Sequence, residues 1–522
     1  MSVYNQNRGG IIQIIIGTIF FLIVAQLVSL QVVSNKYKLA ADNNAIFRKI
    51  IYPDRGIIYD RKKRALLENT ISYDLVVIPN EAKGVDTAAL CNILHIDKAE
   101  YSKRIVEAII KNTRVKAGVF EPFLTPEIYA QLNENLYRFP GFSLSERSIR
   151  SYPYNTAALV LGYVAEVDVK FLKEHESEGY EMGDYAGMIG LEKNYETVLM
   201  GQRGVKRFLR DNKGKIQGPY EKGEFDTVAV AGKNLYTSID VQVQQLAEKL
   251  LQNKIGSAVA INPKTGGVIA MASSPGYNPN LLTGSKRRKT IGRLLLDTAR
   301  PIYNRAIKGQ YPPGSTFKPL GALIALDEGL ITPNFGYNCF GSYGACGDPR
   351  KCEHHNAGHA ANLQLALAYS CNSYFLQVFR MAIDNPKYAS AKGGYVKWKE
   401  YMNAFGFGRK LGVDLPSENK ANIPDTAQYN KDFGNPRYWN SCYMLTLGIG
   451  QDRMTATPLQ LANSMAFIAN DGYYYTPHFV DSIESETQEE AAQLAPFRKK
   501  QKVTKIPKEY FDVIKEGMHD VT

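Results

Sequence analysis

The sequence predicts an α+β protein with more than one domain, attached to a membrane by a single N-terminal helix. Three observations lead to this prediction. The chain has 522 residues, too many for one hydrophobic core. One apolar segment near the start has the length of a membrane helix. From about residue 236, an amphipathic helical pattern is followed by two strand-like runs around a turn, which favours helices packed on an antiparallel sheet.

The apolar segment is residues 11–33, IIQIIIGTIFFLIVAQLVSLQVV. About 23 residues at about 1.5 Å each span roughly 34 Å, enough to cross a bilayer. No small-residue cleavage site follows, so we expect an uncleaved signal anchor. We expect residues 1–10 to be a cytoplasmic tail and the remaining mass to lie outside the membrane. The flanking charges say little about this orientation, because Arg8 precedes the segment and Lys36 and Lys38 follow it.

Composition indicates a folded protein, with 44% hydrophobic and 22% charged residues. The net charge of +12 favours anionic surroundings such as lipid headgroups or acidic polymers. The basic residues are mostly scattered, and the tightest cluster is residues 286–289, KRRK. No nucleic-acid motif surrounds this cluster, so we expect a solvated loop and no nucleic-acid partner.

The sequence pattern changes at about residue 236, so we expect one domain over residues 34–235 and another over residues 236–522. In the first, residues 49–79 alternate short runs with turns, and IIY and YDLVVI predict strands. Residues 84–135 predict helices, because apolar residues recur every three to four positions. Residues 181–235 are rich in glycine and charge and predict the boundary.

The second domain opens with SIDVQVQQLAEKLLQNK, an amphipathic helix. GSAVAINPKTGGVIAMASS then predicts two strands around a Pro-Lys-Thr-Gly-Gly turn. Later, ATPLQLANSMAFIANDG predicts a helix with Thr457 as N-cap, Pro458 at its first position and Gly472 as its stop.

The stretch GQYPPGSTFKPL, residues 309–320, places Ser315 and Lys318 one helical turn apart. Residues three apart share one helix face, so the amine could take the proton of the hydroxyl and activate it as a nucleophile. Pro319 fits only in a first helical turn, and the apolar run LGALIALDEGL predicts that this helix is buried. Burial and the helix dipole would both favour a neutral lysine.

Spacing alone is a weak signal, because Ser417 and Lys420 repeat it in LPSENK. That copy follows a proline in a polar loop with no apolar helix behind it, so we expect no chemistry there. Ser370 and Asn372, in LALAYSCNSYFLQVF, strengthen the case for Ser315. A hydroxyl and an amide two residues apart could face one cleft, relaying protons and binding the lysine or a substrate carbonyl.

These motifs resemble the S-x-x-K and S-x-N of penicillin-binding proteins and serine β-lactamases, whose third motif is K-T-G. YPDRGIIYDR (52–61), FPGFSLSERSIRSYP (139–153), VLGYVAEV (160–167) and GLEKNYETVLMGQRG (190–204) resemble the pedestal of class B penicillin-binding proteins. NRAIKGQYPPGSTFKP, SCNSYF, LGIGQ (447–451) and TPLQLANSMAFIANDG resemble their transpeptidase domain. SCN followed by SYF, after a Cys- and His-bearing insert, resembles the elongation type, penicillin-binding protein 2. The septal type is the alternative.

The resemblance implies a transmembrane helix, a pedestal (dimerisation-type) domain over 34–235 and a penicillin-binding, serine β-lactamase-like transpeptidase domain over 236–522. It implies that Ser315 is acylated, that Lys318 is its base, that Ser370 relays protons and that Asn372 provides active-site hydrogen bonds. The reaction would cross-link peptidoglycan stem peptides ending in D-Ala-D-Ala, and β-lactams would bind the same serine. The setting would be cell-wall elongation and cell shape, at the inner (cytoplasmic) membrane with the catalytic domain outside. The implied partner is a glycan polymerase of the SEDS type within the elongation complex.

The third motif is the departure from the family pattern. Lys264-Thr265-Gly266 precedes Ser315, whereas the family motif follows the S-x-N on a strand beside the nucleophile. We therefore assign Lys264 to the hairpin turn. EYFDVIKEGMHDVT resembles the helix shortly ahead of the family motif, so we expect the transpeptidase domain to be truncated before that strand. Half of the oxyanion hole would then be missing, and the 522-residue chain by itself would be inactive.

The insert CFGSYGACGDPRKCEHHNAGH, followed by Cys371, offers thiols and imidazoles in numbers that suit tetrahedral zinc. The elongation type is thought to carry a metal cluster here, and matching by position suggests Cys339, Cys352, His359 and Cys371. Cys346 and His355 are spare. Three outcomes stay open: a structural zinc, a disulfide with exposed histidines, or neither. No cofactor is expected for catalysis itself.

Three other functions remain as alternatives: a membrane-bound serine β-lactamase, a β-lactam sensor and an inactive scaffold. A hydrolase would need neither the anchor nor a pedestal of about 200 residues. A scaffold would not need Ser315, Lys318, Ser370 and Asn372 together.

Overall fold

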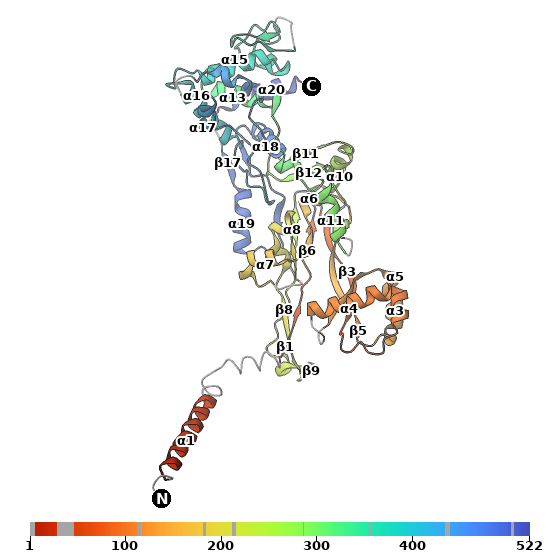
Figure 1. Ribbon diagram of the computed structural model, residues 1–522. Helices are drawn as coiled ribbons and strands as arrows, with labels where there is room; N and C mark the ends of the chain where they lie inside the picture. Colours follow the sequence, from red (N-terminus) through yellow and green to blue (C-terminus); the bar gives the residue numbers. More distant parts are fainter. Residues whose placement is uncertain are drawn as a thin grey trace.

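The computed structural model shows an elongated molecule in which two folded parts follow one another (Figure 1). The pedestal strands lie toward one end and the helices around the Ser-Lys pair toward the other. The structure describes residues 6–28, 46–112, 114, 117–180, 184–210, 216–284, 287–353, 358–433, 439–502 and 506–521.

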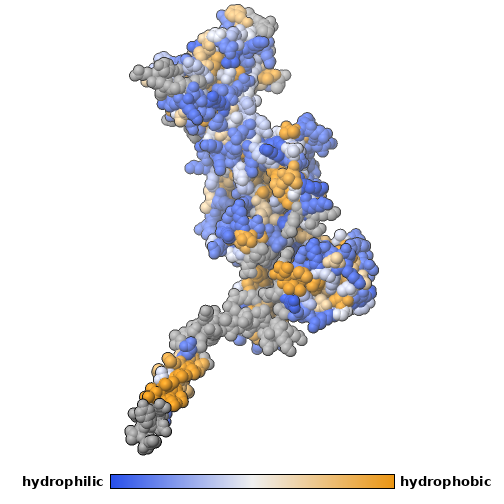
Figure 2. All heavy atoms as spheres, viewed as in Figure 1, coloured by the Kyte–Doolittle hydropathy of each residue, from blue (hydrophilic) through white to orange (hydrophobic). Residues whose placement is uncertain are grey.

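Helix α1, Gln6–Val28, contains the predicted membrane segment. Its stretch Gly10–Val28 is long and apolar enough to cross a membrane and is not buried by any other part of the protein. Figure 2 shows it as a nearly continuous hydrophobic surface. It is therefore a candidate membrane span. Residues 29–33 of the predicted segment lie outside the described residues.

The pedestal is built on strand β3, Ala65–Val77, which pairs antiparallel with β2, β4 and β5. The predicted strands IIY and YDLVVI fall in β2 and β3, which confirms them. A second, three-stranded sheet has the order β1-β8-β9. The remaining pedestal strands are β1 Ile46–Ile51, β2 Ile58–Tyr59, β4 Gly118–Leu124, β5 Phe142–Ser151, β6 Val164–Glu166, β7 Tyr185–Gly187, β8 Gly204–Arg210 and β9 Ile216–Pro219.

Residues 84–135 are only partly helical, which corrects the prediction for this region. Helices α3 and α4 form, but Gly118–Leu124 is strand β4 and pairs with β3 before α5 begins. Tertiary pairing decided this, because β4 buries Phe120 in the small core of this lobe. The pedestal helices are α3 Thr87–Leu94, α4 Lys98–Asn112, α5 Pro126–Asn135, α6 Ala158–Leu161, α7 Val169–Glu174, α8 Gly190–Asn194 and α9 Glu196–Met200.

A buried ionic cluster ties the pedestal strands to α8 and α9. Glu192, fully buried, accepts from Arg150 Nε at 2.6 Å and from Arg55 Nη2 at 2.5 Å. Arg55 also pairs with Glu196 at 2.6 Å. Burial by itself would raise the pKa of Glu192, but the two guanidinium groups outweigh it and hold that pKa below its usual value.

The transpeptidase part begins with the predicted helix and hairpin. Helix α10, Val241–Leu250, starts at the N-cap Asp240, whose carboxylate accepts from Gln242 N. Strands β11, Gly256–Ile261, and β12, Val268–Ser274, pair antiparallel around a turn that holds Lys264-Thr265-Gly266. In this turn Gly266 has φ +83° and its amide donates to Asn262 O. The assignment of Lys264 to a hairpin turn is confirmed.

Helix α13, Lys318–Asp327, lies at the centre of the helical region and is buried along almost its whole length. Helices α14, α15 and α20 pack against it. Helix α18, Pro458–Ala469, has the predicted N-cap, and Thr457 and Gln460 form a reciprocal capping box. The remaining elements are α11 Arg287–Leu296, α12 Arg305–Lys308, α14 Leu363–Ala368, α15 Asn372–Ile383, α16 Ala391–Ala404, α17 Thr426–Phe433, α19 Gln488–Arg498 and α20 Lys508–His519.

Contacts at several places join the two parts. Strand β10, Leu235–Thr237, runs parallel to β2 of the pedestal and antiparallel to β16, Val480–Ile483, so one sheet continues across the junction. Tyr195 of the pedestal donates its hydroxyl to the buried Asp414 at 3.1 Å. Asn280 exchanges two hydrogen bonds with the backbone of Tyr152, at 2.9 and 3.0 Å.

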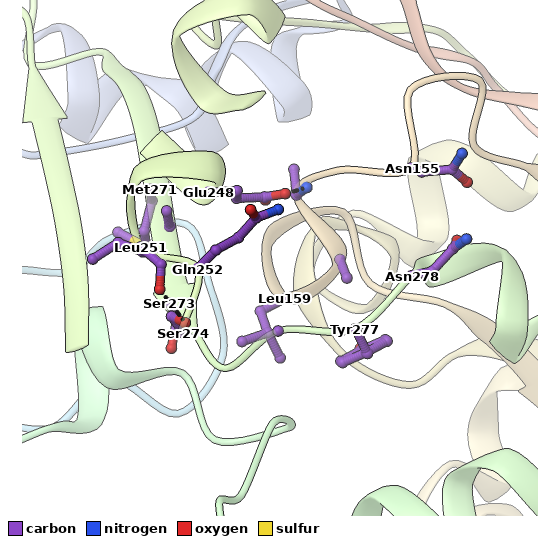
Figure 3. Close-up of a pocket in the computed structure, with 14 residues that line it drawn as sticks. Asn155, Leu159, Glu248, Leu251, Gln252, Met271, Ser273, Ser274, Tyr277 and Asn278 are labelled. Carbon is purple, nitrogen blue, oxygen red and sulfur yellow. Dashed lines mark hydrogen bonds between the residues drawn. The ribbon is translucent and has the colours of Figure 1, made fainter. Parts of the chain in front are cut away.

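A cavity of about 290 Å³ opens at this junction (Figure 3). Pedestal residues such as Asn155 and Leu159 form one side, and Met271 with its neighbours on β12 forms the other. Glu248 of α10 accepts from the Ala157 amide at 2.8 Å and closes the contact.

The ionic cluster yields a test of pedestal stability. Glu192→Ala leaves two buried guanidinium groups without their shared carboxylate, and we expect it to cost about 3–5 kcal/mol of unfolding free energy. Urea unfolding followed by circular dichroism measures this. Glu146→Ala, an exposed position on β5 of the same part, should change it by no more than about 0.5 kcal/mol. Equal, small effects of the two substitutions would show that the cluster does not stabilise the pedestal.

Candidate active site

Ser315 lies on an exposed 3-10 turn, η6, Gly314–Phe317, directly ahead of α13. The turn forms because Gly314 adopts φ +61°, a conformation that suits glycine, after the Pro-Pro pair. Its position is fixed by the segment that ends in LGIG. Gly314 N donates to Gly450 O at 2.8 Å, and a side chain at Gly450 would come within 2.4 Å of Gly314 O. The backbones can therefore approach this closely only with glycine at 450.

Lys318 is the first residue of α13, and its side chain is buried, with 1% of its surface exposed. Its amino group donates to Ser370 O at 2.6 Å, to Ser370 Oγ at 2.8 Å and to Asn372 Oδ1 at 2.7 Å. All three hydrogens of an ammonium group thus have acceptors. Burial lowers the pKa of Lys318 to about 8, so the neutral amine is present at physiological pH.

Ser370 and Asn372 reach Lys318 because α14 ends and α15 begins between them. Ser370 closes α14 with φ +50°, and its amide donates to Leu367 O. Cys371 then caps α15, its sulfur accepting from Tyr374 N at 3.4 Å. The sharp reversal turns the carbonyl and hydroxyl of Ser370 and the amide of Asn372 toward one point. The sequence predicted that Ser370 and Asn372 lie together near Lys318, and their hydrogen bonds to the Lys318 amine show that they do.

Hydrogen bonds join three of the four predicted catalytic residues, Lys318, Ser370 and Asn372. The fourth, Ser315, lies near them in the preceding turn of the chain. Ser315 lies one turn before Lys318, whose amide donates to Ser315 O. Among the described residues, no hydrogen bond joins the Ser315 hydroxyl to the Lys318 amine, which differs from the predicted contact. The amine is instead drawn to the three oxygens of 370–372. Such pairs often tighten only when substrate binds.

Cys339, Cys352, His359 and Cys371 form a buried cluster, with one ligand atom of each within 4.8 Å of the others. The Cys371 sulfur lies 3.2 Å from His359 Nε2 and 3.9 Å from the Cys352 sulfur. These are the four residues that sequence matching suggested. Tetrahedral zinc–thiolate bonds of about 2.3 Å would separate two sulfurs by about 3.8 Å, so the donor set fits zinc.

Cys346, predicted as a spare ligand, is bonded instead to Cys442 in a disulfide. No local pattern pairs these two cysteines, because 96 residues separate them. A metal site and a disulfide are alternatives in the sequence analysis, but in the structure the cysteines divide between a buried Cys-His cluster and one disulfide. His355 lies outside the described residues.

Two further contributors to the site were not predicted. The carbonyl of Lys351, on strand β14, Arg350–Lys351, accepts from Asn372 Nδ2 at 3.1 Å. Gly450 supports the turn that carries Ser315. LGIGQ is a motif in the sequence, but only the fold shows that it packs against the turn that carries Ser315. None of the catalytic candidates lines the junction cavity of Figure 3.

The chain resembles known proteins in both sequence and fold. Residues 256–522 match the model of the penicillin binding protein transpeptidase domain, and residues 50–237 match that of the penicillin-binding protein dimerisation domain. The chain is 32% identical over 477 residues to peptidoglycan D,D-transpeptidase MrdA of Haemophilus influenzae, covering 88% of this chain and 69% of that protein. The chain belongs to the class B penicillin-binding proteins of the elongation type. It is a serine-type peptidoglycan D,D-transpeptidase.

Other relatives agree with this assignment. MrdA of Escherichia coli is 31% identical over 515 residues, covering 96% of this chain and 77% of that protein. Penicillin-binding protein 2 of Helicobacter pylori, solved in complex with MreC, shares the fold with a TM-score of 0.71 at 24% identity, over 91% of this chain and 84% of that one. A chain from a peptidoglycan synthase complex that coordinates polymerization and crosslinking has a TM-score of 0.68 at 25% identity, over 98% and 84%.

The buried lysine predicts the pH dependence of acylation in this transpeptidase. Only the neutral amine can take a proton, and its fraction rises as the pH increases through the Lys318 pKa of about 8. Two units below that pKa roughly 1% of the amine is neutral, so we expect acylation at pH 6 to be roughly 100-fold slower than at the alkaline plateau. Stopped-flow acylation by a β-lactam across pH 6–10 measures it. A flat profile would exclude Lys318 as the base.

Proposed function

We propose that Ser315 is the acylated nucleophile, Lys318 its general base, Ser370 the proton relay and Asn372 the group that holds the lysine. The observation that carries this proposal is the burial of Lys318 against three oxygens of residues 370–372, one turn from an exposed serine. Burial lowers the pKa of the Lys318 amine, and the three oxygens fix its position, so it has the two properties that a base needs.

The reaction then proceeds in two transfers. The Ser315 Oγ attacks the carbonyl of the penultimate D-Ala of a stem peptide, and its proton passes to Lys318 Nζ. The peptide C–N bond breaks, and the proton travels through Ser370 Oγ to the departing D-Ala amine. An amine of a neighbouring stem peptide then attacks the Ser315 ester. The new amide bond forms, the C–O bond of the Ser315 ester breaks, and the proton lost by the attacking amine passes to Ser315 Oγ.

The same serine is the proposed site of β-lactams, which acylate it and are released slowly. For partners, the proposal is a SEDS-type glycan polymerase within an elongation complex. Two solved relatives support this, one in a complex with MreC and one in a complex that couples polymerization with crosslinking.

For location, the proposal is a single-pass protein of the cytoplasmic membrane, with residues 1–10 inside and the catalytic domain outside. The exposed apolar surface of α1 supports a span. The stem-peptide substrate supports the orientation. We further propose a pedestal over 34–235 and a transpeptidase domain over 236–522; the family models match 50–237 and 256–522.

Benzylpenicillin provides the direct test of the nucleophile. We expect intact-protein mass to increase by one drug molecule, and the adduct to map to Ser315 and to be absent in Ser315→Ala. We compare the 522-residue chain with a chain that also carries a K-T-G strand, because the family resemblance predicts acylation only where that strand is present. An adduct that turns over rapidly would indicate a β-lactamase. A stable adduct on Ser417 or elsewhere would contradict the assignment.

We also propose that Cys339, Cys352, His359 and Cys371 hold a structural zinc ion. All four are buried, and the set of three thiols and one imidazole suits tetrahedral zinc. Cys371 lies between Ser370 and Asn372, so the ion would brace the turn that carries both. It would take no part in the chemistry.

Metal analysis tests the zinc proposal. The protein purified without chelator should contain about one zinc per chain, and Cys339→Ser should lose it and unfold at a lower temperature. Cys91→Ser is the matched control, because Cys91 is also a buried free cysteine but lies on α3 of the pedestal. Zinc-free protein with unchanged thermal stability in micromolar zinc would contradict the proposal.

A further inference from the structure

We propose that the hairpin of β13, Ser342–Tyr343, and β14 is a positioning device for Asn372, and that Tyr343 and the Cys346–Cys442 disulfide hold it in place. The inference rests on the proposed role of Asn372. It goes further by naming residues distant from the nucleophile that set the orientation of the amide.

The Asn372 side chain is held by one hydrogen bond at each end of its amide. Its Nδ2 donates to Lys351 O at 3.1 Å, and its Oδ1 accepts from Lys318 Nζ at 2.7 Å. An amide can be turned by 180°, which would put its NH₂ group against the amine of Lys318. The Lys351 carbonyl selects the working orientation, since a carbonyl accepts only from the NH₂ side. The hairpin backbone therefore decides which end of Asn372 faces the base.

The β13–β14 hairpin is too short to be stable without support from other parts of the protein. Each strand has only two residues, and an isolated two-stranded hairpin is marginal even when longer. Its place must come from contacts with the rest of the fold. The base of the hairpin is flanked by Cys339 and Cys352 of the proposed zinc site.

Tyr343 supplies the contact to α15. Its side chain is fully buried, and its hydroxyl donates to Gln377 Oε1 at 2.9 Å and accepts from Arg380 Nη1 at 3.2 Å. Both partners lie on α15, the helix whose first residue is Asn372. The tyrosine thus ties the hairpin that holds Asn372 to the helix that carries it.

The disulfide supplies the contact to η8, Ser441–Ile449. Cys346 lies in the loop between β13 and β14, and its partner Cys442 is the second residue of η8. Arg380 closes the connection, because its Nε donates to Ser441 Oγ at 3.2 Å. The segment η8 leads directly to Gly450, which supports the turn of Ser315. Hairpin, α15 and η8 are therefore linked in one set around the site.

The test separates positioning from ordinary stabilisation. In the protein as the cell makes it, Tyr343→Phe should slow the acylation step by benzylpenicillin about tenfold, with the dissociation constant of the non-covalent complex unchanged. Tyr395→Phe is the matched control. Tyr395 is also fully buried and donates a hydrogen bond to Pro424 O at 2.7 Å, and none of its hydrogen bonds among the described residues involves Asn372 or the hairpin. It should lose similar thermal stability and acylate at the normal rate.

A double-substitution cycle identifies the route. In an Asn372→Ala background, Tyr343→Phe should cause no further slowing, because the amide it positions is gone. Replacing both disulfide cysteines, Cys346→Ser with Cys442→Ser, should slow acylation in the same direction and keeps the test open if Tyr343→Phe does not fold.

Two outcomes would overturn the inference: normal acylation by Tyr343→Phe and by the cysteine pair, or a full tenfold loss that persists in the Asn372→Ala background. Normal acylation by Asn372→Ala itself would instead refute the proposed role of Asn372. The failures of the two proposals are therefore distinguishable.

Discussion

The burial of the Lys318 amine against three oxygens is the constraint around which the catalytic end of this protein is organised. A charged amine in an apolar core is costly, and it is tolerated only with every hydrogen satisfied. The fold therefore needs a sharp break between α14 and α15, since no continuous helix could turn Ser370 O, Ser370 Oγ and Asn372 Oδ1 toward one atom. The compensation is incomplete, and the resulting fall in the pKa makes the lysine usable as a base.

Several long-range contacts exist to hold that arrangement. Helix α13 is buried along its length, so the lysine cannot move without moving the core. Residues 448–450 pack against the turn that carries Ser315. Gly450 allows the two backbones to approach closely, and Gly448 lies against the Phe379 side chain. The exposed serine is thus mounted on rigid elements, which favours an accurate approach to substrate.

The cysteines divide according to their surroundings. Cys339, Cys352 and Cys371 meet a histidine in a buried space, where thiols and imidazole suit a metal ion. Cys346 lies at the loop of a short hairpin beside η8, where its partner Cys442 is within bonding reach. The cluster lies at the base of the insert, and the disulfide lies at its tip. At the junction between the two parts, the shared sheet and the Tyr195–Asp414 contact restrict movement of the transpeptidase domain on the pedestal.

The sequence by itself determined the features that local chemistry fixes. Apolar length predicted α1, the amphipathic pattern predicted α10 and the Thr-Pro pair predicted α18. Motifs that resemble those of penicillin-binding proteins singled out Ser315, Lys318, Ser370 and Asn372 as candidates. The same resemblance also suggested the four cluster residues. Only the tertiary structure decided that Gly118–Leu124 is a strand, that Cys346 bonds Cys442 and that the Lys351 carbonyl holds Asn372. Each of these depends on groups far apart in the chain, whose meeting is set by packing and leaves no local pattern to recognise.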